Sequence, residues 1–409
     1  MDEPLNPLSP EFQADPYPAY HALRAFDPVH YLELPFPDFP GVWVLSRYAD
    51  AVAVLRDERF SARKTEMLHP EPGGPLEQII RRGLLVIDPP DHTRIRTLVT
   101  KAFTPRVVEQ LRPRIQAIVD ERLDAAVAAG ALELIGDLAA PLPIIVIAEL
   151  LGIPDADLKA FKRWSDDLAV IADGTIAFAG LAEAERSAKE LQAYLEGIFA
   201  ERRAHPREDL VTGLVGASEA GDTLSREELL GICTLILVAG HETTTNLIGN
   251  GVLALLRHPA ELARLRDDPS LIRGGIEELL RYDSPVQLTS RMPTVDVEID
   301  GQQIRAGQEV DVLLGAANRD PAQFPDPDRL DVARADVRHL SFGHGIHFCL
   351  GASLARLEGQ IAIGTIVRRL PGLRLVDEKP EWRPGFVLHG LRALPLEFDR
   401  DAALRARAA

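Results

Sequence analysis

Near the C-terminus the sequence reads Phe342-Gly343-His344-Gly345-Ile346-His347-Phe348-Cys349-Leu350-Gly351, and an apolar helical pattern follows from about Leu350. The glycines of this loop tolerate backbone angles and close approaches that a Cβ would obstruct. The predicted helix turns its unpaired N–H groups and the positive end of its dipole toward the Cys349 sulfur. Both features favour a thiolate, which is the form of cysteine that binds metals.

Three interpretations of Cys349 are open from these residues alone. A thiolate delivered by a glycine-framed loop is suited to be the axial ligand of a haem iron. A lone intracellular cysteine is more often a buried structural thiol. The third interpretation is a zinc site formed with His339, His344 and His347, although no second cysteine lies nearby and the spacing matches no common zinc motif.

A second informative segment lies in a long predicted helix. Ser225-Arg226-Glu227-Glu228 is a capping box and no proline follows until Pro259, which predicts one helix from 225 to 257. At roughly 1.5 Å per residue such a helix is about 50 Å long, enough to cross a whole domain. The residues from Cys233 to Ala239 are apolar on every side, so we expect this helix to be buried, with Cys233 as core filling.

The centre of that helix reads Ala239-Gly240-His241-Glu242-Thr243-Thr244, where a buried helix is normally aliphatic. Gly240 weakens a helix by about 1 kcal/mol relative to alanine, and Thr243 can hydrogen-bond a backbone carbonyl one turn earlier. We therefore expect either a local opening that admits water or dioxygen, or a packing point at which small residues let a neighbouring helix approach closely.

Composition and periodicity describe an acidic, mainly helical protein. The sequence has 409 residues with 45 Lys+Arg and 62 Asp+Glu, a net charge of −17, which argues against binding nucleic acid through phosphates. Helical patterns are predicted in six segments: 47–57, 105–127, 137–151, 181–204, 225–257 and 350–370. Strands are predicted at 42–45, 295–299 and 302–305, with a hairpin turn at Asp300-Gly301.

Targeting features and a disulfide framework are absent from the sequence. The N-terminus lacks a basic region and an apolar core, so we expect neither a signal peptide nor an anchor. The apolar run from Leu142 to Ile153 is too short for a membrane span and contains Pro143 and Glu149. Only Cys233 and Cys349 are present, which excludes stabilisation by several disulfides. We therefore expect a cytoplasmic protein that uses no membrane.

The order Phe-Gly-x-Gly-x-His-x-Cys-x-Gly resembles the cysteine-ligand loop of the cytochrome P450 family at every defining position, and Ala-Gly-x-Glu-Thr-Thr is similar to its oxygen-activation motif. The resemblance spans the chain from Asp15-Pro16-Tyr17 to Leu394-Pro395-Leu396. It implies a bacterial, soluble, stand-alone haem-thiolate monooxygenase. The implied fold is mainly α with a small β region, a single domain covering residues 1–409 with haem b between the long central helix and the Cys349 loop.

The resemblance also implies roles for individual residues. Cys349 would bind the haem iron, while Glu242 and Thr243 would relay protons toward dioxygen. The haem propionates would be bound by His92, Arg96, Arg291 and His347. A structural network supporting the cysteine loop would consist of Glu278, Arg281 and Arg329. From the residues themselves, Asp88 and Pro89 predict the start of a helix that carries His92 and Arg96 on one face.

Substrates of the family are bound by segments that are aliphatic and nearly uncharged in this chain. These segments contain Leu84, Leu85, Val86, Leu235, Val238, Ala239, Val286, Leu288, Val387 and Leu388. The resemblance therefore implies a large apolar substrate, such as a macrolide, terpenoid, steroid or fatty-acid derivative, that is hydroxylated or epoxidised with one oxygen atom of O2.

No reductase is expected to be fused to this chain, because the sequence ends soon after the last predicted strands. Electrons are therefore expected from a separate ferredoxin and its reductase. Candidates for a basic docking patch are Arg94, Arg112, Arg114 and Arg338. Two rival functions are a peroxide-driven peroxygenase, which the presence of Glu242 and Thr243 disfavours, and a non-enzymatic family member that recruits partners to a carrier-protein assembly line.

Overall fold

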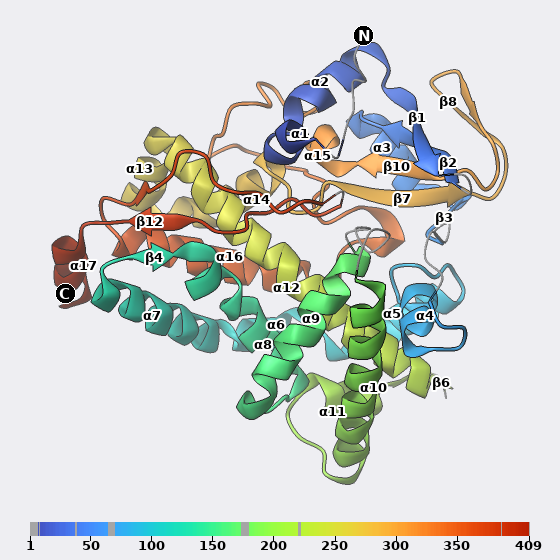
Figure 1. Cartoon of the computed structure of the whole chain (residues 1–409), viewed down its shortest axis with the longest axis horizontal. Coiled ribbons are helices and arrows are strands. Elements are labelled where there is room, and N and C mark those ends of the chain that lie inside the picture. The colour runs from blue at the N-terminus through green and yellow to red at the C-terminus, as the bar shows by residue number, and fades with distance from the viewer. Residues whose placement is uncertain are drawn as a thin grey trace.

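The structure is a computed structural model and describes residue 7 and residues 9–36, 39–63, 70–172, 180–219, 222–385 and 387–408. Helices predominate, with small sheets beside them (Figure 1), which confirms the fold class expected from the sequence. The helices are α1 Pro10–Ala14, α2 Tyr17–Phe26, α3 Tyr48–Arg56, α4 Pro75–Arg82, α5 Asp91–Ala102, α6 Pro105–Gln110, α7 Arg112–Ala129, α8 Pro141–Leu151, α9 Leu158–Ala172, α10 Leu181–Ala204, α11 Leu210–Val215, α12 Arg226–Arg257, α13 Pro259–Asp267, α14 Ile272–Tyr282, α15 Leu314–Asn318, α16 Ala352–Arg369 and α17 Arg400–Ala408.

Among the described residues, the strands form one sheet of five strands and three smaller sheets. Their bounds are β1 Val29–Phe36, β2 Phe39–Leu45, β3 Phe60–Ser61, β4 Leu132–Glu133, β5 Ser218–Glu219, β6 Asp222–Thr223, β7 Leu288–Pro293, β8 Val297–Ile299, β9 Gln302–Ile304, β10 Val310–Leu313, β11 Arg374–Leu375 and β12 Pro395–Glu397. The large sheet has the order β1-β2-β10-β7-β3, and Val310 in β10 lies opposite both Trp43 in β2 and Arg291 in β7. This register fixes Arg291 in the interior of the sheet.

Helix α12 crosses the molecule obliquely (Figure 1) and packs against α8, α9 and α16. Its predicted capping box is present, because the Ser225 hydroxyl accepts the Glu228 N–H and the Glu228 carboxylate accepts the Ser225 N–H. A Cβ added to Gly240 would lie 2.7 Å from Cδ1 of Ile147 on α8. The structure therefore supports a close helix packing point at Gly240, and α12 is continuous there, so the expected opening is not a break in the helix.

Several predicted boundaries are correct. The hairpin of β8 and β9 turns at Asp300 and Gly301, whose φ angles are 50° and 79°. The segments predicted at 47–57, 181–204 and 350–370 appear as α3, α10 and α16 within one or two residues at each end. Cys233 is buried in the main hydrophobic cluster, as expected.

Other predicted boundaries are wrong. The pattern at 105–127 is divided at Leu111 into α6 and α7, with Pro113 in the first turn of α7. The pattern at 137–151 begins as a π-helix, Ile135–Ala139, and becomes α8 only at Pro141. Asp88 and Pro89 do not start a helix, because α5 begins at Asp91 and the Asp88 carboxylate accepts hydrogen bonds from the Ser61 hydroxyl and the Ala62 N–H.

One large hydrophobic cluster extends from Leu76 to Ala403 and includes the buried faces of α7, α8, α12 and α16. Two smaller clusters lie at the five-stranded sheet. Among the described residues, no helix combines the length and the apolar composition that crossing a membrane would require.

Candidate functional site

The loop before α16 holds Cys349 through a tight backbone arrangement. Gly343 and Gly345 adopt φ angles of 69° and 71°, in the left-handed region that favours glycine. The Cys349 N–H donates to the Phe342 carbonyl at 2.9 Å, which closes the loop on itself. A Cβ at position 345 would lie 2.3 Å from the Leu55 carbonyl oxygen, so only glycine fits where this loop passes α3.

The Cys349 sulfur lies in a mixed electrostatic environment. Burial raises the pKa of its thiol, while the N–H groups of Gly351 and Ala352 and the cations Arg96 and Arg356 act in the opposite direction. The amides at the start of α16 therefore face the sulfur, as the sequence predicted. A metal ion at the sulfur would add to these groups and deprotonate the thiol.

A cluster of cationic and polar side chains lies beside Cys349. The rings of His92 and His347 are 4.3 Å apart between centroids, and Arg96 Nη2 donates to the Phe348 carbonyl at 2.8 Å. Arg291, from β7, is buried and lowers the pKa of His347 by its charge, although burial is the larger cause of a shift that takes this pKa to about 3. The structure thus brings together all five residues that sequence analysis assigned to the cofactor.

Buried polar atoms in this cluster lack protein partners. Both ring nitrogens of His92 and Nδ1 of His347 are buried and make no hydrogen bond within the described part of the chain. Burial, with the neighbouring Arg96, lowers the pKa of His92, and burial lowers the pKa of Arg291 to about 10. A buried donor without a partner costs about 1–3 kcal/mol, and because Arg96 and Arg291 lie beside these rings, an anionic acceptor fits the cluster. Two haem propionates supply such acceptors, and the residues present therefore fit a haem.

The zinc interpretation of Cys349 is wrong. Nε2 of His339 hydrogen-bonds Glu277 at 3.1 Å, and its Nδ1 accepts the Ser341 N–H at 3.1 Å, so this ring is committed elsewhere. Over the described ranges, the one group of three side chains with metal-ligand proximity is Asp166, His241 and Glu242, which does not include Cys349. The interpretation as a purely structural thiol leaves the neighbouring partnerless nitrogens without an explanation.

The motif at the centre of α12 presents two polar side chains in different directions. The Thr243 hydroxyl is half-buried and donates to the Ala239 carbonyl at 2.8 Å, the hydrogen bond that the sequence predicted. Glu242 is 8% exposed, and both of its carboxylate oxygens accept from Nη1 of Arg383, at 2.8 and 2.6 Å. Sequence reasoning missed Arg383, because it lies 141 residues away and belongs to no motif.

Arg383 is presented by a hairpin between β11 and β12. Its N–H donates to the Gly390 carbonyl at 2.9 Å, and Trp382 stacks on His389 at 4.0 Å between centroids. Toward the tip of this hairpin, Leu388 pairs with Val286, and the Gln287 N–H donates to the Val387 carbonyl at 2.8 Å. One small element therefore connects Glu242 with two residues predicted to touch the substrate.

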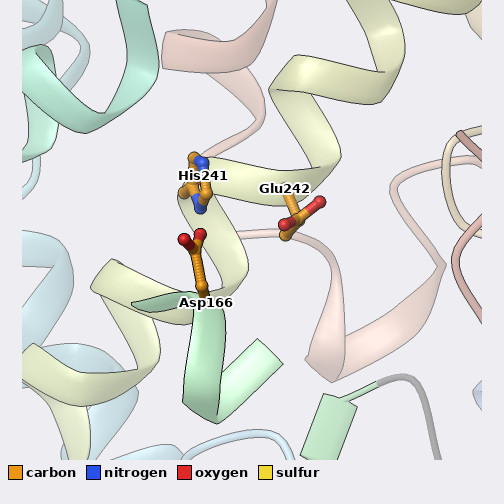
Figure 2. A group of neighbouring side chains, drawn as sticks. All are labelled: Asp166, His241 and Glu242. Atoms are coloured by element: carbon orange, nitrogen blue, oxygen red, sulfur yellow. The ribbon is translucent and has the colours of Figure 1, made fainter. Parts of the chain in front are cut away.

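Figure 2 shows the other neighbours of Glu242. The Asp166 carboxylate, from α9, faces the ring of His241, and one ligand atom from each of Asp166, His241 and Glu242 lies within 4.8 Å of the others. Nδ1 of His241 hydrogen-bonds the Ser165 hydroxyl at 3.2 Å. Burial lowers the pKa of His241 to about 4, so this ring is neutral at neutral pH.

The predicted substrate-lining residues fall into two groups. Leu84 packs in the main core and Leu85 is exposed, so neither shares the environment of the others. The remaining members are half-buried: Val86, Leu235, Val238, Ala239, Val286, Leu288, Val387 and Leu388. On α12 these half-buried residues contrast with the fully buried flanks at 229–234 and 244–255. The half-buried stretch of α12 therefore borders a less densely packed region beside Thr243.

The structural network is present but has a different third member. Glu278 and Arg281 are fully buried and form a two-pronged ion pair at 2.7 and 2.8 Å. The third side chain is Arg334, whose Nε donates to Glu278 at 3.1 Å and which is 13% exposed. The prediction of Arg329 is wrong, because its side chain is 60% exposed and it joins the network only through its carbonyl oxygen.

Each of the four arginines predicted to form a docking patch makes an ion pair with a carboxylate. Arg94 pairs with Glu228, Arg112 with Glu109, Arg114 with Glu149 and Arg338 with Asp336. They therefore do not form a free basic patch. A cleft of about 540 Å³ between α6, α7, α13, α14 and α16 is lined by Arg112, Arg266, Arg273 and Arg368. Arg112 pairs with Glu109 and Arg266 with Asp267, so the excess positive charge of this cleft comes from Arg273 and Arg368.

The chain is similar in sequence and in fold to known proteins over nearly their whole length. The sequence model of the family described as Cytochrome P450 matches residues 180–390. The chain is 46% identical over 402 residues to "Cytochrome P450 monooxygenase PikC" of Streptomyces venezuelae, and the similarity covers 97% of this chain and 94% of that protein.

Two solved structures give the same result. P450BioI, in complex with hexadec-9Z-enoic acid ligated acyl carrier protein, has a TM-score of 0.89 and 41% identity, covering 95% of this chain and 99% of its own. The myxobacterial cytochrome P450 CYP267B1, in complex with myristic acid, has a TM-score of 0.85 and 41% identity, covering 96% and 98%. The cysteine loop, the buried histidine nitrogens without protein partners and these similarities lead to one conclusion: the chain belongs to the cytochrome P450 family and is a haem-binding monooxygenase.

Proposed function

We propose that this enzyme inserts one oxygen atom of O2 into a large apolar substrate, by hydroxylation or epoxidation, and that Glu242 and Thr243 deliver the protons. The observation that carries this proposal is the pair itself: an acid and a hydroxyl adjacent on a buried helix, beside half-buried aliphatic residues. Cys349 would bind the iron, and His92, Arg96, Arg291 and His347 would hold the propionates. The haem, when bound, supplies the activation of dioxygen by electron transfer.

The two α12 residues have distinct tasks in this proposal. Heterolytic cleavage of an O–O bond needs two protons at the distal oxygen, delivered along an ordered path. The hydrogen bond from Thr243 to the Ala239 carbonyl fixes its oxygen and leaves lone pairs to accept a hydrogen bond from water. Glu242, held by Arg383, is the adjacent group able to supply a proton.

A large apolar substrate is favoured by the residues that border Thr243. Leu235, Val238, Val286 and Leu388 are aliphatic and half-buried, and none of them carries a charge. Two similar structures contain ligands of this chemistry: hexadec-9Z-enoic acid carried by an acyl carrier protein, and myristic acid. We therefore propose a long acyl chain or an apolar ring system of similar size as substrate.

The proposed electron donor is a separate ferredoxin-type protein. Ile346 and Phe348, which both precede the ligand cysteine in the loop, are exposed apolar residues of the kind found in interface cores. The arginine-lined cleft begins near Gln360, about 12 Å along α16 from its first residue, within the footprint of a small protein partner. An acidic ferredoxin would match this cationic region on an otherwise acidic enzyme.

We also propose that residues 1–409 form a single haem domain and that the enzyme acts in the cytoplasm. A hydrophobic cluster that joins residues from Leu76 to Ala403 supports a single unit. The relatives named above are matched over 94–99% of their own lengths, which also supports it.

Two experiments test the residue assignments. The reduced protein with carbon monoxide should show a strongly red-shifted Soret band that Cys349→Ser abolishes. With NADH, a surrogate ferredoxin system and a myristic acid or macrolide substrate, Thr243→Ala should still consume NADH but divert most electrons to peroxide. Thr243→Ser retains the hydroxyl and should restore coupling. A Thr243→Ala variant that forms product as efficiently as wild type would remove the proposed role of this residue.

A further inference from the structure

The N-terminal helix α1 contacts the hairpin between β11 and β12 through the side chain of Gln13. The Gly385 N–H donates to Oε1 of Gln13 at 2.9 Å, and Nε2 of Gln13 donates to the Gly385 carbonyl at 2.9 Å. Gln13 therefore pairs with both backbone polar groups of a residue that follows 372 positions later in the chain. A residue on a neighbouring antiparallel strand exchanges two hydrogen bonds with its partner in the same way.

The orientation of the Gln13 amide has one satisfactory solution. Its NH2 group also donates to the Pro7 carbonyl, so the NH2 group faces two carbonyl oxygens while Oε1 faces an N–H. The reversed amide would place its oxygen against two carbonyls and its NH2 group against a donor. The end of this side chain is thus fixed by three hydrogen bonds.

Helix α1 is itself anchored to the body of the protein. The Ser9 hydroxyl accepts the Phe12 N–H at 3.1 Å and caps the helix. The Phe12 ring meets the ring of Tyr20 on α2 edge-on, at 5.7 Å between centroids, and packs against a buried cluster that includes Leu313 of β10. Gln13 therefore reaches the hairpin from a fixed support.

The position of Gly385 in the hairpin gives this contact its consequence. Val387 and Leu388, which are predicted to touch the substrate, lie two and three residues beyond it. On the other side of the hairpin, Leu388 pairs with Val286 in the segment that leads into β7. The tip of the hairpin is therefore held between this segment and α1.

We propose that Gln13 is a positioning residue for substrate recognition, which holds Val387 and Leu388 at the edge of the substrate site. In this role Gln13 touches neither substrate nor haem and acts through Gly385. Without it, the tip keeps its contact with Val286 but loses its restraint from α1. A tip that moves over a wider range must be ordered when a large ligand binds, which weakens binding. The inference rests on the proposed location of the substrate site.

Hydrogen exchange of the holoenzyme tests the contact itself. Gln13→Leu keeps most of the side-chain volume and removes all three hydrogen bonds. Amide exchange in the peptide that contains Gly385 should become about tenfold faster in this variant, because the acceptor that protects this N–H is lost. Gln303→Leu, which removes an exposed side-chain hydrogen bond to Glu298, is the matched control. Equal exchange of this peptide in Gln13→Leu and wild type would overturn the proposal.

Ligand binding tests the consequence for recognition. Imidazole and N-tritylimidazole both bind haem iron through a ring nitrogen, but only the second carries a bulky apolar body that needs the substrate site. Gln13→Leu should weaken binding of N-tritylimidazole about fivefold and leave imidazole binding unchanged, as measured by the shift of the Soret band. A loss of stability alone lowers haem content in both titrations and leaves the ratio of the two dissociation constants as it was. An unchanged ratio in Gln13→Leu would therefore refute the positioning role.

A substitution in the tip separates this inference from the proposal on which it rests. If Leu388→Ala leaves the ratio of the two dissociation constants unchanged, Leu388 does not border the substrate site, and the proposed location of that site fails. If Leu388→Ala changes the ratio while Gln13→Leu does not, only the role of Gln13 fails.

Discussion

Glu358 is a carboxylic acid enclosed in the protein interior, on α16 beside α12. Its residue is 1% exposed, and Oε1 has no hydrogen-bond partner within the described part of the chain. Burial raises the pKa of Glu358 to about 8, although a hydrogen bond with Thr244 opposes the shift. This side chain is therefore mostly protonated at neutral pH, and its ionisation at higher pH should lower the stability of the protein.

The stability of the protein should fall as pH rises from about 4.5 to about 8 because of this group. In that interval the unfolded chain has released a proton that the folded chain still binds, so ionisation favours unfolding by roughly 1.4 kcal/mol per pH unit. Glu358→Gln removes the contribution. In urea unfolding, the free-energy difference between variant and wild type should shift in favour of the variant from pH 6 to pH 8. The exposed Glu397→Gln is the control, and identical pH dependence in wild type and Glu358→Gln would contradict the prediction.

Residues were identified from the sequence where they belong to a local pattern. Cys349 and the Glu242-Thr243 pair stand in recognisable motifs, and His92 and Arg96 are one helical turn apart. Arg383, Arg334 and Asp166 were not identified, because each acts through a partner distant in sequence and none has a characteristic neighbour. The ion pair Glu278–Arg281 could be predicted from its three-residue spacing in the sequence. Its second cation, Arg334, could not, because its position depends on how the following loop folds back onto α14.

At the scale of elements, the cysteine loop depends on two glycines to different degrees. Gly343 and Gly345 both have positive φ angles. A Cβ at 345 would lie 2.3 Å from the Leu55 carbonyl oxygen, whereas a Cβ at 343 would meet no atom closer than the His347 carbonyl oxygen at 3.9 Å. The loop therefore cannot accept a side chain at 345 without moving away from α3, but it has room for one at 343.

Gly345→Ala should lower thermal stability and haem content much more than Gly343→Ala does. The left-handed conformation costs alanine about 1 kcal/mol at either position, and the contact with Leu55 adds a steric penalty at 345 alone. Haem-to-protein ratio after purification and the midpoint of thermal unfolding measure both effects. Equal losses in the two variants would show that backbone conformation, and not the contact with α3, limits this loop.

The network around Glu278 makes a second prediction at this scale. Arg334→Ala removes one of the two cations that bind the fully buried Glu278, and because Arg281 remains paired with it, we expect a loss of about 1–3 kcal/mol. Arg329→Ala removes an exposed side chain and should change stability by no more than about 0.5 kcal/mol. Chemical unfolding of the two variants distinguishes them. A larger loss in Arg329→Ala would make Arg329, and not Arg334, the third member of the network.

Helix and strand positions followed from the sequence where the local chemistry had no competing partner. Ser225 caps α12 as predicted, because its two capping hydrogen bonds are both made with Glu228, three residues along the chain. Asp88 does not cap α5, because the adjoining strand β3 offers the Ser61 hydroxyl and the Ala62 N–H instead. The second outcome requires knowledge of which strand lies next to the loop, and that is a property of the tertiary fold.

For the whole molecule, the distribution of charge matters more than its sum. The net charge of −17 repels acidic partners on average, yet Arg273 and Arg368 give the cleft beside α16 a local excess of positive charge. A locally cationic region on an acidic protein orients an incoming acidic partner, because the rest of the surface repels it. Association should therefore be sensitive both to salt and to these few side chains.

Arg273→Gln combined with Arg368→Gln should slow reduction by an acidic ferredoxin about tenfold at low ionic strength and weaken its dependence on salt. Arg374→Gln, which breaks an exposed pair with Glu397, changes the net charge at a different site and is the control. Stopped-flow reduction under carbon monoxide at several salt concentrations measures the rate. Equal slowing in the control and the double variant would assign the effect to overall charge.

The hairpin that carries Arg383 links two properties that are usually engineered separately, namely substrate selectivity and the amount of product formed per NADH. Leu388 near its tip contacts Val286, just before β7, and Arg383 nearer its base binds the Glu242 carboxylate on α12. Substitutions at Val387 or Leu388 that change which substrate binds should therefore also change the amount of product formed per NADH. Directed evolution for new substrate selectivity should therefore begin at Leu235 or Val238 on α12 and leave this hairpin unchanged until the variants form product efficiently per NADH.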